Sequence, residues 1–352
     1  MSAQPVYRDE AGRAPEGAGD GPVFIGGLDR SGKTTMRALL ASHPRIAIPS
    51  VGSNMETYFY RRYGDLRLSA NFERCLDAML RYKHVRSLQP DAERIRREFA
   101  EGDPTYERLF ALFLSHFAQR EGKPRWGAQT GLIERYADVL MAAYPGVRIV
   151  HMIRDPRDRY EASLALWPDG KGRAGGAVAR WRYSTALAER NLRRYPGQYL
   201  IVRFEDLVRE PETTVRAVCA FLQEPFDAAM LAMPAAQKHQ DLLRRGVDDR
   251  AGEGVALFSE RFIGGHRGVL APAELAFMQL HAGRKMRRFG YEPEPVHLGT
   301  RGRALFAVYE WPRQAVRMAG WRIVEELQQR FPRAVARRPG RRMIVDPPEG
   351  SA

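Results

Sequence analysis

A glycine-rich stretch near the N-terminus carries residue types that suit an anion-binding site. It reads GGLDRSGKTT over residues 26–35 and directly follows the apolar run VFI at 23–25. From Gly27 it fits the pattern G-x-x-x-x-G-K-[ST] without a mismatch. A strand, a glycine-rich turn and a helix start attract anions, because backbone N–H groups of the turn point inward and the helix N-terminus adds partial positive charge. The sequence therefore predicts a phosphate-binding loop.

The side chains of this loop add donors to its backbone. Gly27 and Gly32 permit backbone angles and a close approach that a Cβ atom would block. Lys33 can reach the bridging or terminal oxygens of a ligand, and the two threonines after it offer hydroxyl donors. Arg30 supplies a second cation, which the general pattern does not require. We expect the loop to hold a strongly anionic group.

A magnesium-dependent kinase or triphosphatase would also need a carboxylate at the end of a second strand. The strongest predicted strand, 147–153, ends at Arg154 instead. The predicted strand 199–204 is followed by Glu205 and Asp206, which could bind Mg²⁺, but an E-D-L step is also a common helix cap. No Cys/His spacing typical of a zinc site occurs. The sequence therefore predicts no metal site and gives metal-dependent phosphoryl transfer weak support.

The elements that must position these residues follow an α/β pattern. Helical periodicity alternates with short apolar runs, which predicts a central, mostly parallel sheet. Strands are predicted at 22–25, 46–48, 147–153 and 199–204. Helices are predicted at 35–41, 131–144, 177–194, 211–223 and 271–289, with a further helix starting near Pro156 and helical periodicity across 54–122.

Composition narrows the partners and the setting. The 352 residues carry a formal net charge of +14, which suits an anionic ligand, a nucleic acid or an anionic membrane surface. The two cysteines, Cys75 and Cys219, lie in apolar helical patterns and are expected to be reduced core thiols. Neither a signal peptide nor a run of about 18 apolar residues is present. We therefore expect a cytoplasmic protein.

The chain is expected to divide into three parts. Residues 1–21 are rich in glycine, alanine and charge and are expected to be a disordered lead-in, followed by one domain over 22–293. Residues 294–352 form a basic extension, with eleven arginines and three acidic residues between positions 299 and 342. Its segment 303–330 can be drawn as an amphipathic helix, which either packs on the domain or contacts a membrane surface or a partner.

Five blocks resemble, in the same order, the PAPS-dependent sulfotransferases, which move a sulfuryl group from 3′-phosphoadenylyl sulfate (PAPS) to an acceptor. They are RSGKTT at 30–35 with MRALLASHP at 36–44, WGAQT at 126–130, VHMIRDPRD at 150–158 with Ser163, FEDL at 204–207 and FIGGHR at 262–267. The resemblance covers residues 22 to 293 and implies a three-layer α/β/α fold with a phosphate-binding turn. It also removes the need for a magnesium carboxylate, since a sulfuryl group carries less charge than a phosphoryl group.

The resemblance also implies roles for individual residues. The 5′-phosphosulfate would be held by Arg30, Ser31, Gly32, Lys33, Thr34 and Thr35. Arg154 and Ser163 would hold the 3′-phosphate, and Arg267 would add to the PAPS site. The acceptor would be a hydroxyl of a carbohydrate, a lipid-linked glycan or another small molecule. No metal and no nucleic acid are expected as partners, whereas the extension leaves room for peripheral membrane contact.

The sequence departs from the family pattern at three places. In WGAQT, Ala128 and Gln129 stand where the family often has an acid and a lysine, which implies altered acceptor contacts. Lys33 stands where the family usually has threonine, so the cation that supports the leaving oxygen is either Arg30 or Lys33. Ser163 lies nine residues after Arg154 rather than the usual eight, which puts Ala162 in the expected place. One helical step turns a side chain by about 100°.

A general base that takes the acceptor's proton is commonly Glu or His in this family. We expect it shortly after the helix that follows the loop, and the nearest candidate there is Glu56 in SNMET at 53–57. A substrate-assisted route without a dedicated base is the alternative. Other ionisable candidates are His43, His84, His151, Glu134 and Asp29.

The region 54–122 is expected to shape the acceptor pocket, and its aromatic cluster Tyr58, Phe59, Tyr60 and Tyr63 serves either as helix packing or as an acceptor platform. Two other functions stay open beside sulfuryl transfer. One is a P-loop, magnesium-dependent small-molecule kinase. The other is a basic nucleic-acid-binding or membrane-binding protein whose loop is degenerate, although no nucleic-acid-binding motif occurs.

Overall fold

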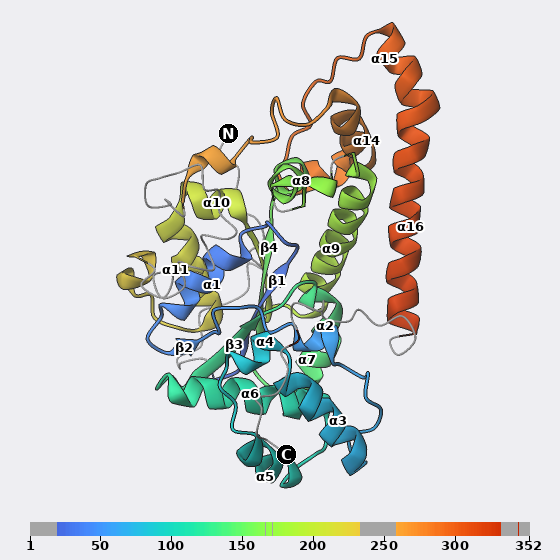
Figure 1. Cartoon of the computed structure of the whole chain (residues 1–352). Coiled ribbons are helices and arrows are strands. Elements are labelled where there is room, and N and C mark those ends of the chain that lie inside the picture. Colours follow the sequence, from blue (N-terminus) through green and yellow to red (C-terminus); the bar gives the residue numbers. More distant parts are fainter. Residues whose placement is uncertain (1–19, 166, 171, 233–257, 332–343, 345–352) are drawn as a thin grey trace.

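A sheet of five parallel strands forms the centre of the protein (Figure 1). The computed structural model describes residues 20–165, 167–170, 172–232, 258–331 and 344. The strands are β1 (Val23–Gly27), β2 (Ile46–Ala47), β3 (Arg125–Gln129), β4 (Arg148–Ile153) and β5 (Tyr199–Arg203), in the order β2-β3-β1-β4-β5. All the pairs are parallel, so the carboxyl ends of the strands share one edge of the sheet.

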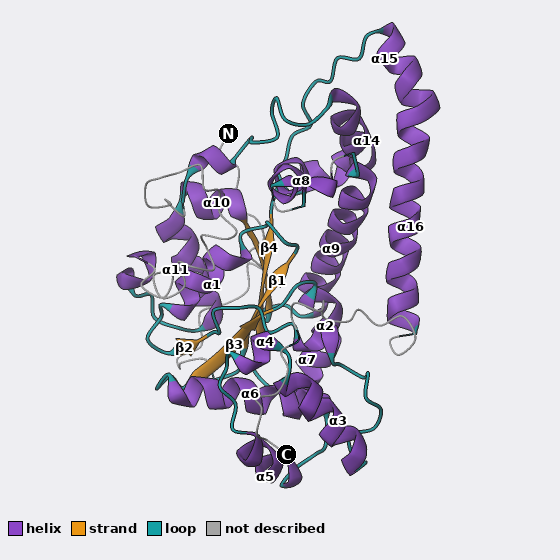
Figure 2. Ribbon diagram, viewed as in Figure 1, coloured by secondary structure: helices purple, strands orange, loops and turns teal. Residues whose placement is uncertain are grey.

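The helices cover both faces of this sheet (Figure 2). Before β4 they are α1 (Lys33–Ala41), α2 (Met55–Tyr58), α3 (Ser69–Leu80), α4 (Lys83–Arg86), α5 (Ala92–Ala100), α6 (Tyr106–Arg120) and α7 (Ala137–Ala143). After β4 they are α8 (Pro156–Leu164), α9 (Ala174–Arg194), α10 (Phe204–Arg209), α11 (Pro211–Leu222), α14 (Pro272–Arg288), α15 (Thr300–Leu305) and α16 (Trp311–Arg330). A π-helical turn, Phe306–Glu310, joins α15 to α16.

Successive side chains of β1 enter two different apolar cores. Phe24 belongs to the core shared with α3, α6 and α9, whereas Val23 and Ile25 belong to the core shared with α1 and α11. All five residues of β1 are buried. Such a continuous apolar run is typical of a parallel strand covered on both faces. The predicted α/β fold with its central parallel sheet is therefore confirmed.

The four predicted strands at 22–25, 46–48, 147–153 and 199–204 are present. The fifth, β3, was not predicted, because its sequence RWGAQ contains neither an alternating pattern nor β-branched residues. Gly127 lets β3 pack closely against β1, because a Cβ atom there would come 2.5 Å from the carbonyl oxygen of Val23. The predicted helix at 131–144 is divided into a 3₁₀ turn, Ile133–Tyr136, and α7.

The C-terminal extension contains a helical rod made of α15, the π-helical turn and α16, and α16 lies along α9 (Figure 1). Gln314 binds the backbone on both sides of the start of α9: its Oε1 accepts the N–H of Gly175 at 2.9 Å and its Nε2 donates to Gly172 O at 2.8 Å. Glu325 pairs with Arg135. The predicted lead-in at 1–21 lies outside the described residues apart from Asp20 and Gly21.

Both cysteines, Cys75 and Cys219, are free and buried, as predicted. Burial raises the pKa of the Cys75 thiol to about 12 and that of the Cys219 thiol to about 11, so both are uncharged near neutral pH. Among the helices that the structure describes, none combines the length and the apolar character needed to cross a membrane.

Substitutions at two neighbouring glycines of α9 test how closely α16 packs against this helix. A Cβ atom on Gly175 would come 2.0 Å from the carbonyl oxygen of Gln314, whereas one on Gly176 would meet nothing within 4 Å. We expect Gly175→Ala to displace α16 and lower the melting temperature. Gly176→Ala should leave the protein unchanged or stabilise it by up to about 1 kcal/mol, since alanine favours the helix. Equal effects of the two substitutions in thermal unfolding would contradict this packing.

Candidate active site

The loop after β1 turns sharply into α1 because two of its glycines adopt positive φ angles, 106° at Gly27 and 91° at Gly32. A Cβ atom on Gly32 would come 2.5 Å from the ring of Phe204. The hydroxyl of Ser31 donates to Leu28 O at 2.5 Å, which closes the turn internally. The glycine-rich turn is therefore held by its own backbone and by the neighbouring Phe204, and its predicted role in binding a phosphate stays a prediction.

The first turn of α1 presents backbone donors to this loop. N–H groups in the first turn of a helix have no partner within the helix, and no acidic side chain lies in the first turn of α1 to occupy them. Thr34 is exposed at this turn, whereas Thr35 is buried. The start of α1 is thus arranged as an anion site with Lys33 as its first residue.

The ammonium group of Lys33 pairs with a carboxylate of the same loop. Its side chain is only 5% exposed, and its Nζ lies 3.2 Å from Oδ1 of the exposed Asp29. The Lys33 charge holds the pKa of the Asp29 carboxyl below its ordinary value. A Cβ atom on Gly131 would come 3.5 Å from the same Nζ, so Lys33 reaches the segment that follows β3.

Glu56 reaches that same segment from the other side. It lies in α2, is 4% exposed, and its Oε2 accepts a hydrogen bond of 3.1 Å from the hydroxyl of Thr130. Burial raises the pKa of Glu56 from its ordinary 4.5 to about 7. Thr130 and Gly131 therefore separate the carboxyl of Glu56 from the ammonium group of Lys33, and residues far apart in the sequence converge at the end of β3.

Arg154 braces the loop from the end of β4. Its Nη1 donates to Arg30 O at 3.1 Å, and its Nη2 donates to Phe262 O at 2.5 Å. The guanidinium lies 4.7 Å from the centre of the Phe204 ring, and the residue is 5% exposed. Arg154 is thus brought to the loop, as the sequence predicted, and holds a second positive charge beside it.

Ser163 and Arg267 have partners other than the loop. The Ser163 hydroxyl donates to Tyr160 O at 2.6 Å within its own helix, while Ala162 is buried in the place expected for a serine. Arg267 is exposed and donates to Glu294 Oε1 at 2.8 and 2.6 Å. Their roles as PAPS ligands stay predictions.

Arg159 is a residue that the sequence analysis missed. It is 5% exposed, and its Nη1 donates to Asp29 O at 3.1 Å, one residue before the carbonyl that Arg154 binds. Burial, together with the nearby charges of Arg180 and Arg154, lowers the pKa of Arg159 to about 10. In the sequence RDPRDR it resembles a solvated charge, and no local pattern distinguishes it from the exposed arginines of the chain.

Two of the histidine candidates have structural partners. His43 Nε2 lies 2.9 Å from Pro225 O, and its Nδ1 accepts the N–H of Arg45 at 3.1 Å. His84 Nδ1 lies 2.9 Å from Gly52 O, and burial lowers the pKa of this imidazole. Both rings therefore hold chain segments together.

His151 and Glu134 support the loop from within the core. His151 Nδ1 lies 2.8 Å from the hydroxyl of Tyr199, and burial lowers the pKa of the ring. Glu134 Oε2 accepts the N–H of Gly27 at 3.2 Å, while its Oε1 accepts the hydroxyl of Ser184 in α9. Glu134 thus fixes the end of β1.

Glu205, the sequence candidate for a magnesium ligand, is fully engaged by the protein. Its Oε1 accepts the N–H of Asp155 at 2.9 Å, its Oε2 accepts the hydroxyl of Tyr291 at 2.9 Å, and burial raises its pKa to about 7. Asp206 lies 3.6 Å from Arg203. Within the described ranges, no group of three or more His, Cys, Asp or Glu side chains is placed to hold a metal ion.

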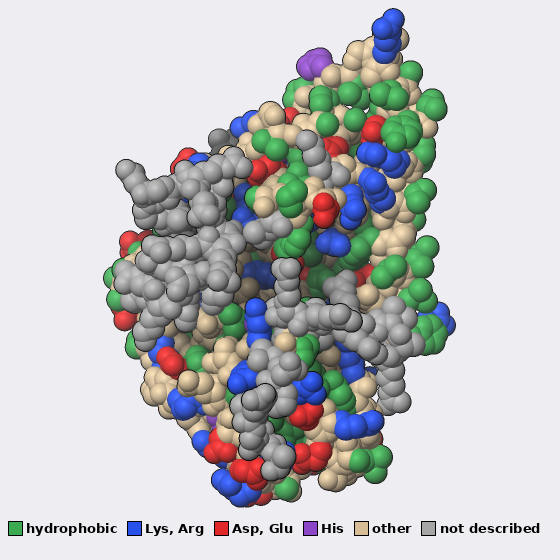
Figure 3. Space-filling view, in the orientation of Figure 1, with side chains coloured by type: hydrophobic (Ala, Val, Ile, Leu, Met, Phe, Trp, Pro, Cys, Tyr) green, Lys and Arg blue, Asp and Glu red, His purple; other side chains and the backbone are tan. Residues whose placement is uncertain are grey.

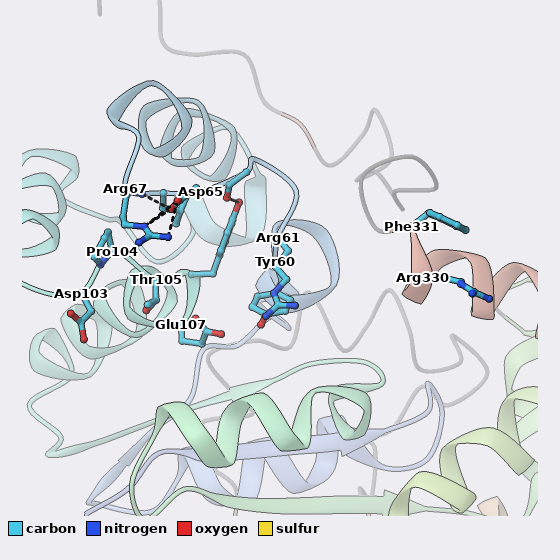
Figure 4. Close-up of a pocket in the computed structure, with 13 residues that line it drawn as sticks. Tyr60, Arg61, Asp65, Arg67, Asp103, Pro104, Thr105, Glu107, Arg330 and Phe331 are labelled. Atoms are coloured by element: carbon cyan, nitrogen blue, oxygen red, sulfur yellow. Dashed lines mark hydrogen bonds and ion pairs between the residues drawn. The ribbon is translucent and has the colours of Figure 1, made fainter.

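A cavity of about 940 Å³ lies beside α2 (Figure 4). It is lined by segments within 60–67 and 103–107 and by Arg330 and Phe331 at the end of α16. Tyr60, four residues after Glu56, lines it and packs its ring edge-on against Tyr106 and Tyr136. Tyr60 is the one member of the predicted aromatic cluster among the lining residues, since Tyr58, Phe59 and Tyr63 belong to the apolar core or pack against it.

Comparison with known proteins decides the family. Residues 22–228 match the model of the sulfotransferase family, which is more than half of the chain. The chain belongs to this family. The sulfotransferase fold is also found in a solved structure, the sulfotransferase domain of the Synechococcus PCC 7002 olefin synthase, with a TM-score of 0.54 at 21% identity over 80% of this chain and 99% of that one.

Two curated relatives are similar to this chain at low identity. A protein-tyrosine sulfotransferase of Drosophila melanogaster is 22% identical over 215 residues, which are 59% of this chain and 39% of that protein. A putative protein-tyrosine sulfotransferase of Caenorhabditis briggsae is 21% identical over 232 residues, or 64% and 71% of the two chains. The match thus spans less than half of the Drosophila protein. The predicted family is confirmed.

The buried carboxyl of Glu56 makes stability depend on pH. Because the pKa is about 7 in the folded protein against 4.5 ordinarily, the folded state binds the proton more strongly between these values. The contribution of Glu56 to the free energy of unfolding therefore falls as pH rises from about 4.5 to about 7. We therefore expect the free energy of unfolding of Glu56→Gln, measured in urea relative to that of the wild type, to rise by up to about 3 kcal/mol as the pH is raised from 5 to 8.

The control for this measurement is Glu121→Gln, which changes an exposed glutamate. It should show the pH dependence of the wild type. If the stability of Glu56→Gln changed with pH as that of the wild type does, burial would not be raising the pKa of this carboxyl.

Proposed function

We propose that the protein transfers a sulfuryl group from PAPS to a hydroxyl of an acceptor, without a metal ion. The convergence of Lys33 and Glu56 on Thr130 and Gly131 carries this proposal. It brings a cation of the anion-binding loop and a carboxyl suited to accept a proton to two adjacent residues of one short segment. Family membership supports the same reaction class.

The donor would lie with its 5′-phosphosulfate in the loop and its 3′-phosphate toward α8. Backbone N–H groups of Gly32 to Thr35 and the hydroxyls of the threonines would bind the first group. Arg154, fixed by two carbonyls and by the Phe204 ring, would present its planar guanidinium to the second. We place Ser163 and Arg267 at the periphery of this site, because the single hydroxyl proton of Ser163 is donated within its own helix and the side chain of Arg267 is 70% exposed and paired with Glu294.

Transfer would proceed by direct displacement at sulfur. Glu56 takes the proton of the acceptor hydroxyl, while the acceptor oxygen forms a new bond to sulfur. The bond between sulfur and the bridging oxygen of the 5′-phosphate breaks, and its electron pair leaves with adenosine 3′,5′-bisphosphate (PAP). A base with a pKa near 7 is matched to neutral pH, since it is partly ionised and still basic enough to accept the proton.

We assign the support of the leaving oxygen to Lys33 rather than Arg30. The Lys33 ammonium lies near Gly131, on the side of the loop that leads to Glu56. Arg30 adopts a φ of 67°, and its carbonyl is bound by Arg154 on the other side. Arg30 would then contribute to the general positive field of the loop.

The cavity beside α2 is our candidate for the acceptor. Its lining residue Tyr60 follows Glu56 by four positions in the chain. The cavity combines aromatic rings with charged side chains of both signs, among them Arg61, Asp65 and Glu107. These features suit a hydroxyl on a carbohydrate, on a lipid-linked glycan or on another small molecule. A panel of sugars, lipid-linked glycans and phenols separates these classes, and a tyrosine peptide belongs in it because both relatives are named for tyrosine.

Calorimetry with PAP tests the donor site. PAP should bind equally well with Mg²⁺ and with EDTA. Lys33→Ala and Arg154→Ala should each weaken binding by about 10- to 100-fold, since hydrogen bonds to charged groups contribute about 1.5–3 kcal/mol. The matched controls Lys83→Ala and Arg193→Ala remove exposed cations elsewhere and should bind PAP like the wild type. Magnesium-dependent ATP turnover, with PAP binding no tighter than AMP, would overturn the proposal in favour of a kinase.

The pH dependence of kcat tests the base. The rate should rise with pH through about 7 as Glu56 ionises. Thr130→Val removes a hydrogen bond that stabilises the carboxylate, so the midpoint should move to higher pH. Glu56→Gln should abolish this limb and lower the rate by about 10²- to 10⁴-fold. If Glu56→Gln kept both the limb and the rate while still binding PAP, a substrate-assisted route would replace Glu56.

A further inference from the structure

The helical rod of α15 and α16 turns its apolar side chains away from the protein. Val308 is 80% exposed, Val316 is 71% exposed, and Leu305, Ile323 and Leu327 are exposed beside them. These positions follow one another at spacings of three, eight, seven and four residues, which are helical spacings, so they form one stripe along the rod. Figure 3 shows hydrophobic side chains along the edge of the molecule that this rod occupies.

The opposite face of the same rod contacts the domain through polar and apolar side chains. Gln314 is 1% exposed and Glu325 is 3% exposed. Arg317 donates to the backbone of Gly172, and Glu325 pairs with Arg135. Met318 packs against the core, and the ring of Trp321 packs edge-on against that of Tyr183.

A surface helix normally buries its apolar face, whereas this rod leaves most of its aliphatic side chains exposed. The contacts of its inner face hold it in this orientation, so that the apolar stripe faces away from the residues that the structure describes.

Charge at the margins of the stripe distinguishes between occupants. Arg301 and Arg303 are exposed at its start, Arg322 and Arg330 are exposed toward its end, and Glu326 is the single exposed acidic residue along the rod. Two copies of the chain that met along this face would bring like charges together, which opposes association. An anionic surface with an apolar interior satisfies both features, because it accepts the apolar side chains and attracts the arginines.

Aromatic side chains strengthen this choice. Tyr309 is 54% exposed on the rod, and Phe331 is 50% exposed where the stripe ends. Amphipathic aromatic rings favour the boundary between water and hydrocarbon. The stripe from Leu305 to Phe331 extends for about 39 Å at 1.5 Å per residue, which allows the rod to lie flat.

We propose that the outward face of α15 and α16 docks the protein on an anionic lipid surface. The rod lies in the plane of the membrane, with the stripe among the acyl chains nearest the headgroups and the arginines among the lipid phosphates. Arg330 and Phe331 also line the cavity beside α2, so docking brings the wall of that cavity to the membrane.

Vesicle co-sedimentation of the full chain tests this proposal. The wild type should sediment with mixed phosphatidylglycerol–phosphatidylcholine vesicles, bind pure phosphatidylcholine vesicles at least about tenfold more weakly, and lose binding at high salt. The double variant Val316→Glu/Ile323→Glu should lose binding to the mixed vesicles by more than tenfold. Its PAP binding, measured in parallel, should equal that of the wild type and confirm that it is folded.

The matched control is Thr213→Glu/Ala220→Glu, which adds two negative charges seven residues apart on an exposed face of α11. It should bind the mixed vesicles like the wild type. Equal loss in both double variants would reduce the effect to net charge and overturn the proposal. Failure of the wild type to bind the mixed vesicles would also overturn it. If sedimentation equilibrium showed that the wild type is a dimer and that Val316→Glu/Ile323→Glu is a monomer, the occupant of the stripe would be a second copy of the chain.

Discussion

The parallel pairing of β1 with β3 on one side and β4 on the other is the constraint on which the site depends. The register puts Ile25 opposite Gln129 and Gly27 opposite Met152, so the three strands end at one level. The loop after β1, Thr130 after β3 and Arg154 after β4 therefore emerge side by side. Open α/β sheets place ligand contacts at this edge, because the connections there diverge around a crevice.

Two buried arginines in and beside α1 carry a desolvation cost. Arg37, in α1, is 1% exposed, none of its guanidinium nitrogens has a hydrogen-bond partner among the described residues, and burial lowers its pKa to about 10. Burial and the neighbouring arginines lower the pKa of Arg159, which binds the loop at Asp29 O, to about 10. Fixed positive charge of this kind favours an anion that enters a dry site, since the donors need no reorganisation when it binds. Under the proposed function, the anionic donor would offset part of this cost at Arg159.

Local signals made the loop and most of the sheet predictable. The turn of Gly27 and Gly32 is fixed by residues within a few positions of each other, and apolar runs mark β1 and β4. The strand β3 was not predicted, because its glycine is required by close contact with the backbone of β1, about a hundred residues away in the chain. Glu56 was found through its position after the loop helix, but the burial that raises its pKa arises from tertiary packing. The direction of the C-terminal rod was likewise invisible, because Gln314 and Arg135 determine which face is covered.

The ion pair between Asp29 and Lys33 would turn binding of the proposed donor into an exchange of counter-ions. The carboxylate of Asp29 lies 3.2 Å from the ammonium group of Lys33 and neutralises part of the charge of the loop. Under the proposed function, an incoming phosphosulfate would displace this carboxylate, and the carboxylate would replace the departing PAP. The pair would then compete with substrate and product alike, which would weaken the binding of both and hasten product release. A loop that held its lysine free would bind its nucleotide more tightly and turn over more slowly.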